Sequence, residues 1–283
     1  MVDDRVTIAG AGKVTGGVYE SVRIAGSGKI DGDVEAKTIT TAGSCKIEGN
    51  AKAEEFSTAG TCKVTGAVAA GEMKTAGVCT VSGDVTADLF KCSGSQKIGG
   101  RLSANYARIA GHCEVGGDVE ADKFLSEGAF QIGGLLSADE IDIRLGGNCH
   151  ASEIGGERIK VRRRHEGHGG MSQESKLKHG LEQVGEKLDR FGERFGIEIN
   201  IDSERLSQEL SRLGERIRID FGGSGVLTTD LIEGDEIDLS WTEAGLVRGK
   251  RVKIGKGCRI KRVEYSESLE VAAEGEVAER SKL

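Results

Sequence analysis

The sequence predicts an all-β protein, a right-handed parallel β-helix (solenoid) with about 17 residues per coil and an inserted α-helical segment. Three observations lead to this fold class. A glycine recurs at almost constant spacing, apolar and polar residues alternate between these glycines, and the composition holds 44 glycines, no proline and only 4% aromatic residues. Abundant glycine with few aromatic residues favours many thin, similar layers over one compact core.

The recurring glycine sets the length of the repeat. After a first spacing of 16 residues, the next six spacings are all 17, and a second glycine follows six positions after each of the first. We expect these glycines at corners of the coil, where a positive φ or a close backbone approach is needed. The first set is Gly10, Gly26, Gly43, Gly60, Gly77, Gly94, Gly111 and Gly128, and the second set is Gly16, Gly32, Gly49, Gly66, Gly83, Gly100, Gly117 and Gly134.

Alternation between the glycines predicts short strands with one buried face. Each coil carries a branched residue four positions after its first glycine, as in Val14 and Ile30, and an aliphatic residue four positions further on, as in Val18 and Val34. Such a coil holds three short strands and is too short for a crossover helix, so equivalent strands of successive coils pair in parallel about 4.8 Å apart. The usual hand of parallel crossovers predicts a right-handed coil.

The pattern divides the chain into four parts. An N-terminal β-solenoid covers residues 5–161, a linker with a helical insertion covers 162–222, C-terminal rungs cover 223–272, and a polar tail covers 273–283. Apolar stripes within residues 171–221 predict an amphipathic helix over 173–196 and a second helix carrying Leu206, Leu210 and Leu213. This segment either packs on the solenoid or docks on a partner. The single tryptophan, Trp241, is expected to fill the C-terminal core.

Charge and composition exclude several classes of protein. The net charge of −7 and a pI near 5.5 argue against non-specific binding to nucleic acid, which needs a basic surface. No stretch approaches the ~20 apolar residues of a membrane span, and the first five residues lack the features of a signal peptide. We therefore expect a cytoplasmic protein whose thiols are reduced.

One row of cysteines is the main candidate for a chemical site. Stacked thiolates can bind a soft metal or cross-link, whereas a small buried side chain also suits a narrow solenoid interior. The second interpretation is favoured, so the sequence predicts a structural cysteine ladder and neither a metal nor another cofactor. Gln96 interrupts the row and is expected to be a buried amide bonded to its own row or to water. The ladder comprises Cys45, Cys62, Cys79 and Cys113.

The linker holds the other candidates. His165 and His168 suit a loose metal or phosphate contact, and the run Arg162–Arg164 suits an anionic surface. Both are interpreted as parts of an exposed, glycine-rich linker.

The ends of the solenoid are predicted to be polymerisation surfaces. An uncovered end leaves a row of unpaired N–H and C=O groups, which is a template for another chain, and monomeric solenoids cover it with a cap. Alternation begins within the first ten residues, so we expect no cap on the first coil. The predicted end residues are Val6, Ile8 and Val14 at the N-terminal end, and Leu269 and Val271 at the C-terminal end.

The repeated block Gly-x-x-Lys-Ile-x-Gly-x-Val-x-Ala, seen at residues 26–36, resembles the polymer-forming bactofilin family. Residues 232–239, 247–249 and 254–258 are similar to the C-terminal half of longer bactofilin-like proteins of Firmicutes. The resemblance implies a cytoskeletal protein that forms nucleotide-independent, non-polar filaments, often at the membrane, to support cell shape, motility or polarity. It also implies that the partner is the protein itself, with other bactofilin-like proteins and the membrane periphery as further partners. The lack of proline and the predicted insertion depart from the family pattern.

Three alternatives stay open. A β-solenoid scaffold that forms only dimers or small oligomers is expected if the insertion covers one end. A solenoid enzyme such as a hexapeptide-repeat acyltransferase is disfavoured, because those left-handed coils have 18 residues per turn and place branched residues every sixth position. A surface adhesin-like solenoid is disfavoured by the absence of a signal peptide, so the sequence predicts a non-enzymatic cytoplasmic protein, with membrane association as a further expectation.

Overall fold

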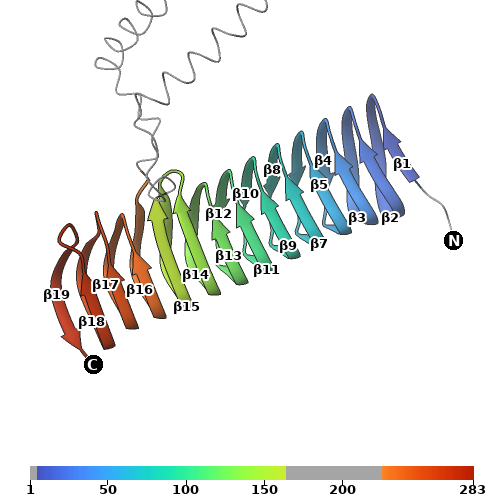
Figure 1. Ribbon diagram of the computed structural model, residues 1–283. Helices are drawn as coiled ribbons and strands as arrows, with labels where there is room; N and C mark the ends of the chain where they lie inside the picture. The colour runs from blue at the N-terminus through green and yellow to red at the C-terminus, as the bar shows by residue number, and fades with distance from the viewer. Residues whose placement is uncertain (1–4, 164–224) are drawn as a thin grey trace, which may run out of the picture. The chain divides into compact units, whose positions relative to one another are not determined.

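The computed structural model describes residues 5–163 and 225–283, and the regular structure of these residues is entirely β-strand (Figure 1). The strands follow one another along the chain as a continuous series of coils. They are β1 (Arg5–Ile8), β2 (Ala11–Ile24), β3 (Ser27–Thr41), β4 (Ser44–Glu48), β5 (Ala51–Thr58), β6 (Thr61–Val64), β7 (Val68–Thr75), β8 (Val78–Val81), β9 (Val85–Cys92), β10 (Ser95–Ile98), β11 (Leu102–Ile109), β12 (His112–Val115), β13 (Val119–Ser126), β14 (Ala129–Leu145), β15 (Cys149–Arg163), β16 (Leu227–Leu239), β17 (Thr242–Ile254), β18 (Arg259–Val271) and β19 (Glu276–Lys282).

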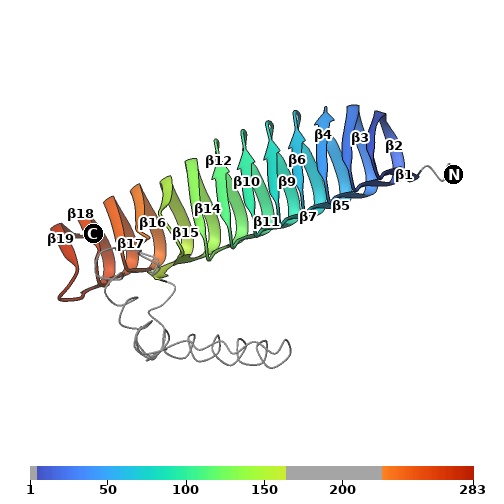
Figure 2. The same cartoon turned by 90° about the horizontal axis from the view of Figure 1, so that it is seen from above.

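Every strand pair among the described residues is parallel, and each strand pairs with the equivalent strand one coil later. One inward position can be followed through about 13 coils, which at the spacing of paired strands stack to roughly 60 Å. The predicted parallel β-solenoid is therefore confirmed (Figures 1 and 2). The residues of this position are Ile8, Ile24, Thr41, Thr58, Thr75, Cys92, Ile109, Ser126, Ile143, Val161, Leu239, Ile254 and Val271.

The core consists of several parallel rows of side chains along the inside of the coils. Burial alternates along the inner strands as predicted, so that in β9 the side chains of Val85, Ala87, Phe90 and Cys92 are buried. Phe90 is paired with Met73 in the preceding coil and Ala107 in the following one. This row therefore holds large side chains in most coils and one small side chain, Ala107, directly after Phe90.

The first glycine of each coil is required by a close approach between successive corners. A Cβ atom on Gly60 would lie 2.0 Å from the carbonyl oxygen of Gly43, and one on Gly77 would lie 2.0 Å from that of Gly60. The same distance recurs at the following corners up to Gly128. Gly10 is different, because a Cβ atom there would meet nothing within 4 Å. For the first set of glycines, close approach is the predicted reason that applies, whereas Gly32 of the second set has a positive φ of 106°.

The first coil departs from the predicted pattern. It is one residue shorter than the 17-residue coils that follow it directly, and the pairing of β2 with β3 shifts between Thr15 and Gly17. Gly17 therefore takes the inward place opposite Val34, and the inward place predicted for Val18 is wrong: Val18 lies opposite Glu35 and is 75% exposed. Tyr19 follows at the position that holds alanine in later coils.

The solenoid continues across the predicted insertion. Cys149 pairs with Leu227 and Val161 pairs with Leu239, so β15 and β16 are successive coils although 78 residues separate their partners. The predicted helices within 171–221, together with His165 and His168, lie outside the described residues. Arg162, predicted to begin the linker, instead belongs to β15, where its guanidinium bonds the Asp142 carboxylate at 2.8 Å.

The C-terminal end also differs from the prediction. Residues 276–282, assigned above to a polar tail, form β19, which pairs with β18. Trp241 is half-buried and packs against the core from a corner, where its φ is 56° and the guanidinium carbon of Arg163 lies 3.2 Å from its ring centroid. Leu239 and Thr242 take the inward positions on either side of it. None of the described residues belongs to a helix that is long and apolar enough to cross a membrane.

Candidate assembly surfaces and thiol column

The predicted N-terminal end residues lie together on the first coil. Val6 pairs with Val22, Ile8 with Ile24 and Val14 with Ile30. Ile8 is 7% exposed, whereas Val6 and Val14 are only half-buried and pack against the core from its end. Among the described residues, β1 has one neighbouring strand, β2.

Hydrogen bonds at the corners show what an added coil would meet at this end. The N–H groups of Ala25 and Ser27 donate to the carbonyl oxygens of Ile8 and Gly10, at 2.8 and 2.9 Å, and the next corners repeat the pattern. The equivalent donors of the first coil are the N–H groups of Ala9 and Ala11, which have no earlier coil among the described residues. This edge therefore presents main-chain N–H donors that are placed to bond the carbonyl oxygens of a further coil stacked in the same register.

Tyr19 partly fills the first coil. Its ring lies beside Gly17, whose Cβ would be 3.5 Å from the phenol oxygen, and its hydroxyl donates to the carbonyl oxygen of Thr15 at 2.7 Å. Tyr19 is half-buried and packs against the core, so it replaces the inward valine that this coil lacks. Sequence reasoning missed this residue because constant spacing was assumed through the shortened first coil.

The predicted C-terminal end residues lie on the last part of β18. Leu269 pairs with Val252 and Val271 with Ile254, and both are half-buried. Among the described residues no strand follows them on this side, because β19 covers only the earlier part of β18. The end surface also includes Val277 of β19, which the prediction missed. Gly275 followed by alternation at Val277 was the available signal.

The predicted cysteine ladder is a buried column in the coil interior. Cys45 pairs with Cys62 and Cys62 with Cys79, followed in register by Gln96 and then Cys113. All four thiols are free and buried. We call these five residues the thiol column. Among the described residues, no group of three or more histidine, cysteine or acidic side chains is arranged to hold a metal ion.

Gln96 is bonded across the corner and not along its own row. Its Oε1 atom accepts a hydrogen bond from the Thr75 hydroxyl at 2.8 Å. Its Nε2 atom is buried and has no hydrogen-bond partner among the described residues. The prediction of a buried amide is confirmed. Its hydrogen-bond partner, Thr75, belongs to a different inward row, which faces the thiol column at this corner.

Raised pKa values lower the reactivity of two of the buried thiols, Cys113 and Cys149. The pKa of Cys149, which follows the thiol column two coils further on, is raised to about 12 by desolvation. The pKa of Cys113 is raised well above its ordinary value, first by a hydrogen bond with Cys92 and then by burial. Because the thiolate is the reactive form, such thiols are inert at neutral pH.

We expect the native protein to resist thiol-specific reagents. Ellman's reagent should label none of the seven cysteines at pH 7 until denaturant unfolds the stack, since all seven are buried and free. The measurement is absorbance with and without denaturant. Fast labelling of one equivalent in the native protein would contradict this assignment.

The outer surface carries ion pairs, most of which join successive coils. The Glu48 carboxylate forms ion pairs with the Lys29 and Lys46 ammonium groups, at 2.7 and 2.5 Å. These contacts lower the pKa of Glu48 from 4.5 to about 2, and the hydrogen bond from Lys29 is the largest cause. Glu140 and Glu264 have lowered pKa values for the same kind of reason, with Lys123 and Arg248 as their leading partners.

These pairs give a pH dependence of known sign. A carboxylate whose pKa is lower in the folded state stabilises that state above its unfolded pKa, and the contribution is lost as the pH falls through the folded pKa. For Glu48 we expect the free energy of unfolding to decline between about pH 4.5 and about pH 2. Urea unfolding across this range should show a shallower decline in Glu48→Gln. Identical pH profiles would contradict the pairing.

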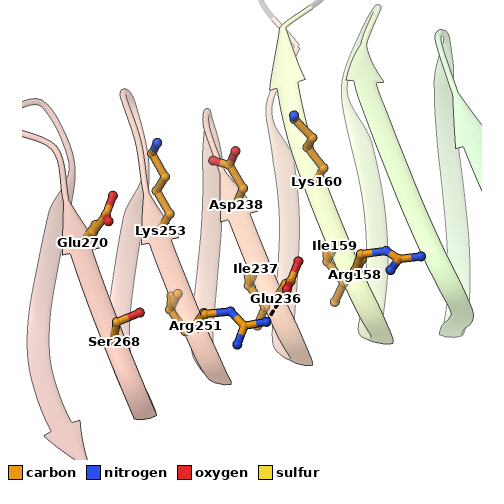
Figure 3. A pocket seen from close by; sticks show the side chains of 11 residues that line it. Arg158, Ile159, Lys160, Glu236, Ile237, Asp238, Arg251, Lys253, Ser268 and Glu270 are labelled. Atoms are coloured by element: carbon orange, nitrogen blue, oxygen red, sulfur yellow. Dashed lines mark hydrogen bonds and ion pairs between the residues drawn. The ribbon is translucent and has the colours of Figure 1, made fainter.

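The C-terminal coils carry two shallow open hollows with charged linings. One, of about 540 Å³, lies over β15 to β18 and is lined by both signs of charge, including Arg158, Lys160, Glu236 and Asp238 (Figure 3). The other, of about 780 Å³, includes His150, Asp230, Glu243 and Lys261. His150 bonds the Thr228 carbonyl oxygen at 3.1 Å. Neither hollow is enclosed, so both are surface features of the coil stack.

Comparison with known proteins shows short shared segments. The chain is 46% identical over 59 residues to "Uncharacterized protein YhbF" of Bacillus subtilis (strain 168), a segment that covers 21% of this chain and 25% of that protein. It is 58% identical over 41 residues to "Uncharacterized protein YhbE" of the same organism, covering 14% of this chain and 17% of that protein. The matches thus span a quarter or less of each relative. No family model matches the chain, and no solved structure does.

Proposed function

We propose that this protein is a non-enzymatic structural component that polymerises end to end into nucleotide-independent filaments, in the manner of bactofilins. The coil is taken as right-handed, and the setting as the cytoplasm, with the membrane periphery and other bactofilin-like proteins as further contacts. The protein's main partner in this proposal is a second copy of itself.

The observation that carries the proposal is the state of the two end coils. Among the described residues, β1 has a neighbour on one side only, and so does the last part of β18. Val6, Val14, Leu269 and Val271 are half-buried at these ends, whereas the equivalent residues of inner coils are fully buried. Stacking a further coil would bury these side chains and pair the uncovered main chain.

Electron microscopy of the purified protein without nucleotide tests the proposal. We expect threads many times longer than the roughly 60 Å of one stack, with a uniform width. Monodisperse single stacks at high protein concentration would overturn it.

A second candidate is a scaffold that forms only dimers or small oligomers. Tyr19 favours it, because its half-buried ring already occupies part of the first coil. In that case the C-terminal end alone would pair, and particles of about twice the length of one stack would dominate the same images.

A further inference from the structure

Four charged side chains form an outward-facing column on the C-terminal coils. Lys160 pairs in register with Asp238, Asp238 with Lys253, and Lys253 with Glu270. The signs therefore alternate, positive, negative, positive, negative, at steps of about 4.8 Å. Figure 3 shows the four side chains in a row, one on each of β15, β16, β17 and β18. We call these four residues the charged column.

The charged column is unused by the described part of the chain. Within residues 5–163 and 225–283, none of its four side chains makes a hydrogen bond or ion pair, and all four are exposed or partly exposed. The next position before Lys160 is Asp142, which is held by Arg162 at 2.8 Å. The series of unpaired charges within the described residues therefore starts at Lys160.

Neighbouring charges on the same face behave differently. Arg251 bonds Glu236 and also Glu267, the latter at 2.8 Å, and Arg158 bonds Glu140. Several opposite charges on this face therefore pair with one another. The charged column keeps the same alternation but leaves its charges to the solvent.

When the charged column is reversed end for end, every position carries the opposite charge of the original. If a second copy lies face to face and antiparallel, the two-fold axis falls between Asp238 and Lys253. Lys160 then faces the partner's Glu270, and Asp238 faces the partner's Lys253. Each contact occurs twice, so all four side chains of both copies meet an opposite charge.

Other arrangements match less well. Parallel copies in register oppose like charges at every step. Parallel copies displaced by one coil form three opposite pairs and leave one charge of each copy unmatched. The adjacent row is compatible with the same antiparallel arrangement, because the two-fold axis also brings Glu236 opposite the partner's Arg251. This row consists of Arg158, Glu236, Arg251 and Ser268.

We propose that the charged column is a lateral docking surface for a second copy of this chain, bound antiparallel through a two-fold contact. Exposed ion pairs each contribute little, so a single contact is weak and sensitive to salt. Copies joined end to end present the contact repeatedly, which strengthens it by multivalency. The lateral contact does not depend on end-to-end stacking.

Charge exchange provides the test. Asp238→Lys alone and Lys253→Asp alone each set like charges opposite one another across the two-fold axis. We expect each to raise the dissociation constant of lateral pairs about tenfold at low salt. The double variant Asp238→Lys/Lys253→Asp restores every opposite pair in the antiparallel arrangement, and so does an equimolar mixture of the two single variants.

Matched controls come from another outward position. Glu35→Lys and Lys52→Asp change the net charge by the same amounts, and these residues form their own ion pair at 2.7 Å on β3 and β5. They should leave lateral pairing unchanged. Circular dichroism would verify that all variants remain folded.

The readouts separate this proposal from the proposed function. Particle width in electron micrographs and the mass from sedimentation of short particles report lateral pairing, whereas particle length reports end-to-end stacking. Single-width particles of the unaltered protein at low salt would overturn the proposal. Failure of the double variant to restore pairing would also overturn it, since parallel copies displaced by one coil would behave in that way.

Discussion

Replacing Gly77 by alanine is expected to lower the free energy of unfolding by about 3 kcal/mol. The added Cβ would lie 2.0 Å from the Gly60 carbonyl oxygen and 2.7 Å from that of Ala59. Both atoms belong to the backbone of the preceding coil, so no side-chain rotation relieves the contact. The two coils must separate at this corner, and the main-chain hydrogen bond from Val78 to Gly60, 2.9 Å long, is strained or lost.

Gly10→Ala is the matched control for this experiment. Gly10 occupies the same corner position, but a Cβ atom there meets nothing within 4 Å. At protein concentrations that keep both proteins unassembled, we expect Gly10→Ala to unfold at nearly the same urea concentration as the unaltered protein. Similar losses for both variants would contradict close approach of the coils as the cause of the loss in Gly77→Ala.

Replacing Phe90 by alanine should cost about 3–5 kcal/mol. Phe90 is fully buried, and its neighbour in the next coil is already an alanine, Ala107. Two small residues in succession would leave a cavity that a stack at fixed spacing cannot close. The measurement is urea unfolding followed by circular dichroism.

Phe90→Met is the control for shape against volume. The preceding coil holds Met73 at the same position, so methionine fits this interior. We expect a loss below about 1.5 kcal/mol. A loss as large as that of Phe90→Ala would mean that the aromatic ring is required for more than its volume.

The repeat made most of the fold predictable, because each coil imposes its register on the next. Once Gly43 and Gly60 were recognised as equivalent, the pairing of Cys45 with Cys62 and the inward direction of both thiols followed. The approximate ends of the stack followed in the same way. The resemblance to bactofilins and the polymerisation itself stay predictions.

What escaped prediction lies where the coil length changes. The shortened first coil moved Val18 outward and brought Tyr19 inward, which no constant period anticipates. At the other end, β19 is mostly charged, so its single inward valine, Val277, was too weak a signal. Trp241 was expected inside the C-terminal core, but it packs against that core from a corner, beside Arg163.

The charged column was out of reach for a different reason. Lys160 and Asp238 become neighbours only when β16 resumes the stack after the residues between β15 and β16. The length of that segment hides their register in the sequence. The alternation of charge therefore appears only in the folded chain.

The most direct test of end-to-end stacking uses Gly10→Ala as a block on assembly. At inner corners a Cβ atom collides with the carbonyl oxygen of the coil before it, whereas the space before Gly10 is open among the described residues. If another copy stacks there in register, the added methyl group obstructs it without disturbing the fold. Sedimentation of the unaltered protein and of Gly10→Ala, without nucleotide, should show large polymers for the first and folded short particles for the second. Polymers of equal size from both would contradict stacking through this end.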